Sequence, residues 1–317
     1  MGRILTSVDA WQRRHTVPAV MVGLARKFRD DRGGNLAALV TYYAFFSVFP
    51  LLLVFVSTLG FVLEDDPTLR DDIVSTTVGR IPVLGPQLDD RLHPLTGSTV
   101  ALVAGLVTAL WAGLGVMLAL ARAFDTIWDV PRLGQRGAIA ARLRGMIVLV
   151  VLAIGIVVST VAASAATGHL GAGAERVVTV AGSLALNAVV FGVAFQVLGA
   201  HRLRVVEILP GAALAAVGSL LLQLAGTWYV DSAVDRASDT YGAFAVVIGL
   251  LSWFLLGSYI LILSAELNVV LHRRLWPRSL SGELAPADRD AMRLAAGGAR
   301  RDAREEIAVH FADPDPP

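Results

Sequence analysis

Polar side chains are rare inside the long apolar runs of this sequence, so each of them is a candidate for chemistry. Glu266 lies inside the last run, roughly 8 Å before its end at about 1.5 Å per residue. An unpaired carboxylate is costly to bury in an apolar medium, so such a group is normally paired, protonated or functional. Two interpretations stay open: an ion pair with Arg122, Arg142 or Arg144, or a site that binds a coupling proton or cation.

Other residues in the runs mark further candidates. Asn187 and Gln223 lie deeper in the apolar stretches, where an amide serves either an interhelical hydrogen bond or a substrate contact. Pro50 removes one backbone hydrogen bond from the first run and predicts a kink, which is either a hinge or a static bend. The candidates for substrate contact or coupling are Tyr43, Pro50, Asn187, Gln223, Tyr241, Glu266 and Asn268.

The sequence lacks the patterns of the common soluble enzymes. Its six histidines are isolated from one another and cysteine is absent, and no H-E-x-x-H spacing is present, which argues against a zinc site. Neither a Walker A sequence nor a G-x-S-x-G elbow occurs. We therefore expect no catalytic residues, no metal and no cofactor, and we expect that the chain is not an enzyme. Its net charge of +1 gives no general attraction to nucleic acid.

Apolar residues dominate the composition. Hydrophobic residues make up 55% and charged residues 17%, and the mean hydropathy is +0.65, which is unlike soluble globular chains. Runs of about 20 residues are long enough to cross the hydrocarbon layer of a membrane as helices. We therefore predict an all-α, polytopic membrane bundle of six transmembrane helices over residues 36–63, 98–120, 145–167, 177–199, 206–229 and 242–271.

Basic and acidic loops alternate along the chain, which predicts its orientation. Cytoplasmic loops near membrane segments are rich in Arg and Lys. Residues 1–35, 121–144 and 272–278 are basic, whereas residues 64–97 and 230–241 are acidic. We therefore expect a multi-pass protein of the bacterial inner membrane with both termini in the cytoplasm. The expected domains are a cytoplasmic amphipathic arm (1–35), a transmembrane domain (36–271) and a cytoplasmic, partly disordered tail (272–317).

The arm combines apolar and basic residues on a helical period. Val20, Met21, Leu24 and Phe28 recur at spacings of three and four beside a basic cluster. This pattern predicts a helix on the inner membrane surface, held by apolar burial and by anionic lipid headgroups. The expected partners are therefore membrane lipids rather than nucleic acid, and a homo-oligomer is compatible with the sequence.

Three stretches resemble the YihY/BrkB family of bacterial inner-membrane proteins, namely residues 31–53, 110–132 and 207–271. The likeness covers about residues 20–275 and includes Pro50 after two tyrosines, Trp111, Pro210-Gly211, Tyr241-Gly242 and Ala265-Glu266-Leu267-Asn268. The resemblance implies six spanning helices and supplies no catalytic residues. Members of this family were once labelled ribonuclease BN, but this sequence offers neither a metal cage nor a basic groove for a nuclease.

The expected function is transport or flipping of a lipid or another amphiphile. Few charges lie inside the runs and most of the loops are short, which suits a hydrophobic cargo better than a hydrophilic ion. In this interpretation the first, second and fifth helices shift around a cavity that contains Asn187, Gln223 and Glu266. The alternatives are a non-transporting envelope scaffold and, least favoured, a ribonuclease.

Overall fold

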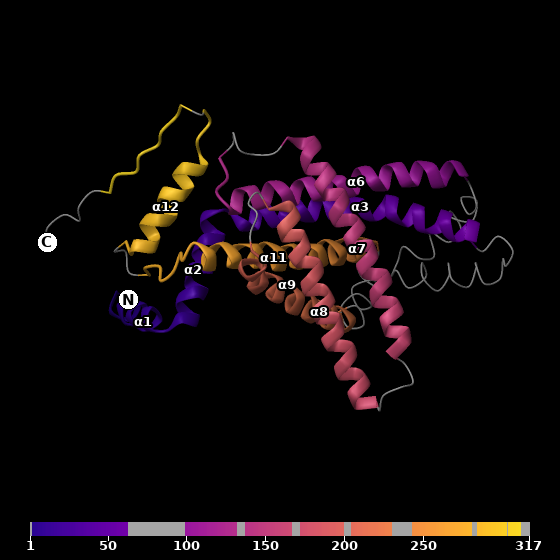
Figure 1. Cartoon of the computed structure of the whole chain (residues 1–317), viewed down its shortest axis with the longest axis horizontal. Coiled ribbons are helices and arrows are strands. Elements are labelled where there is room, and N and C mark those ends of the chain that lie inside the picture. The colour runs from indigo at the N-terminus through magenta and orange to yellow at the C-terminus, as the bar shows by residue number, and fades with distance from the viewer. Residues whose placement is uncertain are drawn as a thin grey trace. The chain divides into compact units, whose positions relative to one another are not determined.

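The computed structural model of the chain describes residues 2–62, 99–131, 137–166, 172–199, 204–229, 243–280, 284–302 and 304–311. All regular elements in these ranges are α-helices, which confirms the predicted fold class. Figure 1 shows these helices, which are α1 (Gly2–Arg14), α2 (Thr16–Asp30), α3 (Gly33–Val62), α6 (Thr99–Ile127), α7 (Ala138–Ala166), α8 (Ala172–Leu198), α9 (Val205–Tyr229), α11 (Ala243–His272) and α12 (Pro286–Gly298).

Five helices in the described ranges are long and apolar enough to cross a membrane. The candidate spans are Gly33–Val54 in α3, Leu102–Ile127 in α6, Val180–Leu198 in α8, Val205–Ala225 in α9 and Val247–His272 in α11. The remaining predicted segment, 145–167, largely coincides with α7, which is not among these five. The chain is thus multi-pass, while the count of six crossings and the side on which the termini lie stay predictions. The predicted outer loop (64–97) lies outside the described residues.

The second transmembrane helix extends beyond its predicted end. The predicted helix ends at residue 120, two residues before the charged Arg122, but α6 continues to Ile127. The added turns stay helical because Ala121 and Phe124 are buried in the protein, while Arg122 is exposed. A helix can leave the hydrocarbon layer and still bury one face against its neighbours.

The chain divides into two compact units. Unit 1 comprises residues 1–36, 120–217 and 260–317, and unit 2 comprises residues 37–119 and 218–259. Within unit 2, α3 and α6 approach closely where α6 carries glycine. A Cβ atom at Gly105 would lie 3.1 Å from Leu53 Cγ, and one at Gly115 would lie 3.0 Å from Tyr43 Cδ1. Small residues allow such close helix contact in a membrane.

Glycine also allows close contact between helices in unit 1. α7 and α8 are neighbours (Figure 1), and a Cβ atom at Gly155 on α7 would lie 3.0 Å from Val190 Cγ2 on α8. α9 and α11 also approach closely, since a Cβ atom at Gly211 would lie 2.3 Å from the carbonyl oxygen of Ser264. No residue larger than glycine fits there without a shift of the backbone.

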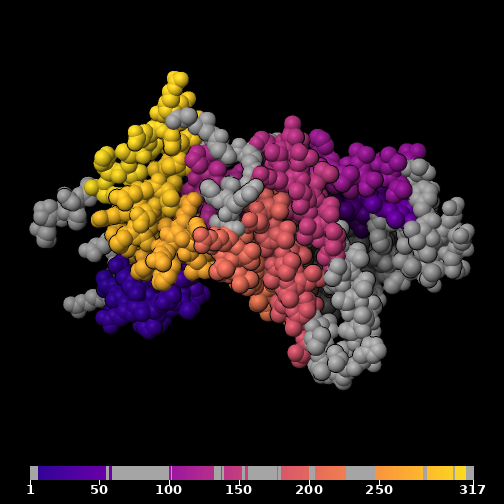
Figure 2. All heavy atoms as spheres, viewed as in Figure 1, coloured from indigo at the N-terminus to yellow at the C-terminus, as the bar shows by residue number. Residues whose placement is uncertain are grey.

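The arm packs on the chain that follows α11. The buried face of α2 consists of Ala19, Gly23 and Lys27, and a Cβ atom at Gly23 would lie 2.8 Å from the carbonyl oxygen of Leu275. The predicted apolar stripe is a different face, since Met21 is 64% exposed. Figure 2 shows the arm (indigo) beside the segment after α11 (orange to yellow). The arm is held by protein on one face, and contact of its apolar stripe with lipid stays a prediction.

Candidate functional site

Three helices of unit 1 end near one another, and each is followed by a residue in the left-handed conformation. These residues are Arg32 (φ 54°), Asp129 (φ 50°) and Arg274 (φ 52°). After α6, the N–H of Val130 donates to the carbonyl of Asp125 (2.9 Å), which is the Schellman pattern, and α11 ends in the same way. A non-glycine residue in this conformation is strained, so its surroundings must hold it.

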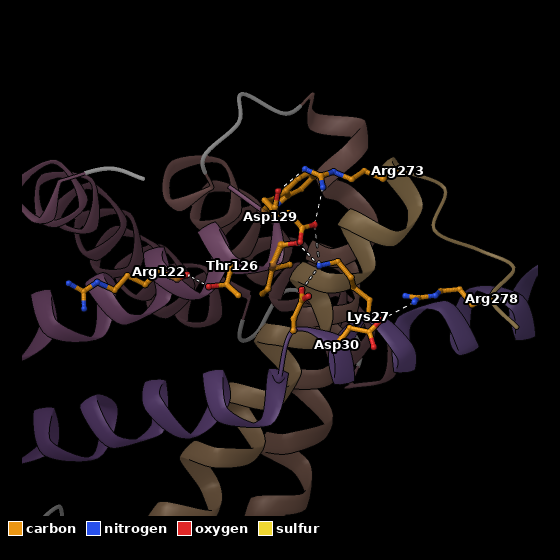
Figure 3. A network of polar contacts seen from close by, with 10 residues as sticks. Lys27, Asp30, Arg122, Thr126, Asp129, Arg273 and Arg278 are labelled. Carbon is orange, nitrogen blue, oxygen red and sulfur yellow. Dashed lines mark hydrogen bonds and ion pairs between the residues drawn. The ribbon is translucent and has the colours of Figure 1, made fainter. Parts of the chain in front are cut away.

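Lys27 links the end of α2 to the end of α6. Its Nζ atom donates to the carbonyl oxygen of Ile127 (3.0 Å), forms an ion pair with Asp31 and lies 3.5 Å from Asp129 Oδ2. Only 3% of the Lys27 side chain is exposed. Figure 3 shows its ammonium group directed toward Asp129. A buried ammonium group requires such partners because desolvation of the charge is costly.

Arg273 links the end of α11 to the same place. Its Nη1 atom donates to Asp129 Oδ2 (3.0 Å) and its Nη2 atom donates to the carbonyl oxygen of Trp128 (2.6 Å) (Figure 3). The guanidinium group also lies over the Trp128 ring, 5.6 Å from its centroid, which is a cation–π contact. Asp129 therefore faces cations from two helices, and these contacts hold its strained backbone.

Glu266 completes this cluster from within α11. Its side chain is fully buried, and neither of its carboxyl oxygens meets a hydrogen-bond donor. Its carboxyl group lies within hydrogen-bonding range of the Asp31 carboxyl and interacts electrostatically with Lys27 and Asp129. We call Lys27, Asp31, Asp129, Glu266 and Arg273 the charge cluster.

The ion pair expected from the sequence for Glu266 does not form. In the part of the chain that the structure describes, Arg122, Arg142 and Arg144 make no ion pair with it. The cation beside Glu266 is Lys27, which the packing of α2 on the end of α11 brings there. The predicted partners of Glu266 all belong to the basic segment between the second and third predicted helices, whereas Lys27 belongs to the arm.

Burial and charge oppose each other in the cluster. Burial by itself lowers the pKa of Lys27, but attraction to Glu266, Asp31 and Asp129 outweighs burial and raises that pKa above its ordinary value of 10.5. Burial raises the pKa of the Asp31 carboxyl from 3.8 to about 6, even though the Lys27 ammonium lowers it. Lys27 is therefore charged at neutral pH, and Asp31 titrates close to neutral pH.

Arg278 forms a buried ion pair within the tail and a second, partly exposed ion pair with the arm. Arg278 Nε donates to Asp288 Oδ1 (2.7 Å), and Arg278 Nη2 lies 2.9 Å from Asp30 Oδ2. Asp288 Oδ2 accepts from the backbone N–H groups of Ser279 (2.9 Å) and Ala285 (3.0 Å). Burial by itself raises the pKa of Asp288, but these hydrogen bonds outweigh it and lower that pKa below 3.8. The start of the tail is therefore ordered by buried polar contacts.

The described residues of unit 1 line a charged cleft and an apolar groove. A charged cleft of about 350 Å³ between α2 and α12 is lined by Lys27, Asp31 and Asp129 together with residues of the tail, so water in the cleft reaches the charge cluster. An apolar groove of about 490 Å³ lies between α8 and α9, where small side chains such as Gly192 and Ala212 leave room.

Asn268 and Tyr43, both predicted as site residues, contact glycines of neighbouring helices. Asn268 is buried on α11, and its Oδ1 atom accepts a hydrogen bond from the N–H of Gly211 on α9 (2.7 Å). Tyr43 packs against Gly115 of α6. Pro50 lies inside α3, which remains helical on both sides of it.

The other predicted site residues are not brought together in a described cavity. Asn187 is half-buried on α8, and Gln223 is exposed on the part of α9 that belongs to unit 2. Neither lines the α8–α9 groove or the charged cleft. Tyr241 lies outside the described residues. Glu266 is therefore the candidate that the structure places in a cluster of other functional groups.

Lys27, Asp31 and Asp129 are not among the predicted site residues, because all three lie outside the apolar runs. Charged residues next to membrane segments were interpreted as topology signals. The residue type could have identified Lys27 as a candidate, since it is the only lysine in the sequence. A compact ammonium group with three rotatable donors can serve several carboxylates at once, which the planar guanidinium of arginine does less well.

Apolar helices of membrane-spanning length, ended by buried charges, define a polytopic α-helical integral membrane protein. The chain belongs to the Virulence factor BrkB family, whose profile matches residues 24–288. This match confirms the resemblance inferred from the sequence. It includes the whole charge cluster.

Several curated proteins are similar to this chain. The inner membrane protein YhjD of Escherichia coli is 29% identical, with 79% of this chain and 80% of that protein covered. The ribonuclease-like protein YfkH of Bacillus subtilis is 25% identical, with 79% and 94% covered. The UPF0761 membrane protein Mpe_A1422 of Methylibium petroleiphilum is 30% identical, with 76% and 59% covered. No solved structure shows significant similarity. The chain is a multi-pass protein of the bacterial inner membrane.

Proposed function

We propose that this chain is an inner-membrane transporter or flippase for a lipid or another amphiphile. The observation that carries the proposal is the groove between α8 and α9. Its volume of about 490 Å³ falls in the range of roughly 300–1,000 Å³ that is usual for small-molecule sites. Both helices are candidate membrane spans, so the groove is positioned for a ligand that resides in the bilayer.

The lining of the groove suits an apolar chain. Small residues, including Ala188, Gly192 and Ala212, form its floor, and Gln196 supplies a polar group. Val189 and Leu209, also in the lining, are 61% and 56% exposed. A hydrated ion finds few ligands on such a surface, whereas an acyl chain loses little by moving there from the bilayer.

Transport of a fluorescent phospholipid in liposomes tests the proposal. The purified protein is expected to speed movement of the lipid between leaflets relative to protein-free liposomes. Gly192→Leu is expected to abolish most of this activity by filling the groove, since Gly192 lines the groove and a Cβ atom there would already lie 3.9 Å from Ala212 Cβ. Gly182→Leu on the same helix is the matched control, because a Cβ atom there meets nothing within 4 Å.

Failure of the wild-type protein to move lipid, together with an unchanged lipid distribution in cells that lack the gene, would overturn the proposal. That result would favour the scaffold alternative. The proposal includes no catalytic step and no nucleic-acid partner. It includes contact of the arm with anionic lipid, for which the exposed Val17 and Met21 beside basic residues give the physical basis.

A further inference from the structure

The charge cluster contains more acids than bases. Asp31, Asp129 and Glu266 meet the two cations Lys27 and Arg273. If every group were ionised, one negative charge would be left without a counter-charge among largely buried side chains. Such a charge is costly to bury, so the site must bind a further cation to become neutral.

The excess negative charge lies on the pair formed by Asp31 and Glu266. Asp129 is paired with Arg273 at 3.0 Å, and Lys27 forms its ion pair with Asp31. Glu266 is fully buried, and neither of its oxygens faces a donor. Its carboxyl group instead lies within hydrogen-bonding range of the Asp31 carboxyl. Two carboxylates that face each other without a donor repel, but a single proton between them converts the repulsion into a hydrogen bond.

We infer that Asp31 and Glu266 form a proton-binding site that holds one exchangeable proton between their carboxyl groups. The proton is carried by Glu266, which donates to Asp31, while Asp31 keeps its ion pair with Lys27. This assignment satisfies the buried acid, leaves two carboxylates opposite two cations and requires no bound metal. It also goes beyond the proposed function and stands without it, because it concerns proton binding in the protein at rest.

The two acids differ in access to water. Asp31 lines the charged cleft between α2 and α12, whereas Glu266 does not. A proton therefore travels between the cleft and Glu266 through Asp31, whose pKa of about 6 suits exchange near neutral pH. The same geometry provides a route for proton coupling, since Glu266 lies in a membrane-spanning helix and Asp31 in the link between the arm and α3.

Two other titratable groups at these helix ends, Glu207 and Asp30, have separate partners. Glu207 at the start of α9 lies 3.4 Å from His272 Nδ1 and accepts from the N–H of Arg204 (2.7 Å). Asp30 pairs with Arg278. Asp125 is buried on α6 one turn before Asp129. Glu207 is the best control, because it is a carboxyl group at the same end of the bundle that has a histidine and a backbone N–H beside it.

Infrared spectroscopy of the full chain in lipid nanodiscs tests the inference, because a protonated carboxyl group and a carboxylate absorb at different frequencies. At pH 7 the wild-type protein is expected to show a protonated-carboxyl band. Glu266→Gln removes the carrier, and Asp31→Asn removes the negative charge that holds the proton, so each variant is expected to lose this band. Glu207→Gln is expected to keep it.

Proton uptake gives a second readout. Between pH 8 and pH 5, Glu266→Gln and Asp31→Asn are each expected to bind about one proton fewer than the wild-type protein, while Glu207→Gln shows a smaller difference. Lys27→Met removes the cation that favours ionisation, so its band is expected to persist to higher pH. The inference is overturned if the wild-type protein lacks the band at pH 7, or if the band survives in either Glu266→Gln or Asp31→Asn.

Discussion

Lys27 is the residue on which the contacts between the arm, α6 and α11 converge. It is buried and serves Asp31, Asp129 and the carbonyl of Ile127. Truncation of one partner in a buried ion pair costs more than the pair itself contributes, because the remaining charges stay buried without compensation. Substitution of Lys27 alone is therefore expected to lower stability strongly, although this residue lies outside the candidate membrane spans.

Lys27→Met is therefore expected to destabilise the protein by about 3–5 kcal/mol. Arg29→Met, an exposed position on the same helix, is expected to change stability by less than about 0.5 kcal/mol. Thermal unfolding of the two variants in the same detergent measures the difference. Equal unfolding temperatures for both variants would contradict the role given to Lys27.

Asp288 controls the start of the tail in a pH-dependent manner. Its pKa is lowered below 3.8, so its hydrogen bonds stabilise the tail above about pH 4 and are lost as pH falls through the lowered pKa. Asp288→Asn is expected to weaken the protection of α12 against amide hydrogen exchange about tenfold or more at pH 7. Exchange corrected for its intrinsic pH dependence should show acid loss of protection in the wild-type protein and little further loss in the variant.

At the scale of the elements, glycine allows the backbones of α9 and α11 to approach closely. Gly211→Ala is expected to destabilise the protein by roughly 1–3 kcal/mol, because its Cβ atom would lie 2.3 Å from a backbone oxygen. Gly192→Ala on α8 is the matched control, since its Cβ atom would lie 3.9 Å from Ala212, and removal of a helical glycine is mildly favourable. The packing would be contradicted if Gly211→Ala lowered the unfolding temperature less than Gly192→Ala does.

The elements were predictable from sequence to the extent that their causes are local. Long apolar runs identified the membrane helices, because length and hydropathy alone decide whether a segment suits a bilayer. The end of α6 was not predictable in this way, since burial of Phe124 by neighbouring helices keeps the chain helical beyond Arg122. The charge cluster depends on contacts between Lys27, Ile127 and Glu266, which are distant in sequence, and only the candidate Glu266 was found.

For the protein as a whole, the basic segments are expected to lie on the cytoplasmic side of the membrane. The charge cluster, the charged cleft and the contacts of the tail with the arm all involve these segments. On this orientation the cleft opens to the cytoplasm, and the proton site exchanges with that compartment. The positive-inside rule supports this orientation.

The absence of cysteine from the sequence allows a direct test of this orientation with single introduced cysteines. Gly137 is an exposed residue just before α7, where a side chain would meet nothing within 4 Å. Asp89 lies in the predicted outer loop, outside the described residues. Each is replaced by cysteine in turn. A membrane-impermeant maleimide is expected to label Asp89→Cys in intact spheroplasts and Gly137→Cys only after the membrane is permeabilised. Labelling of both positions from the same side would contradict the account.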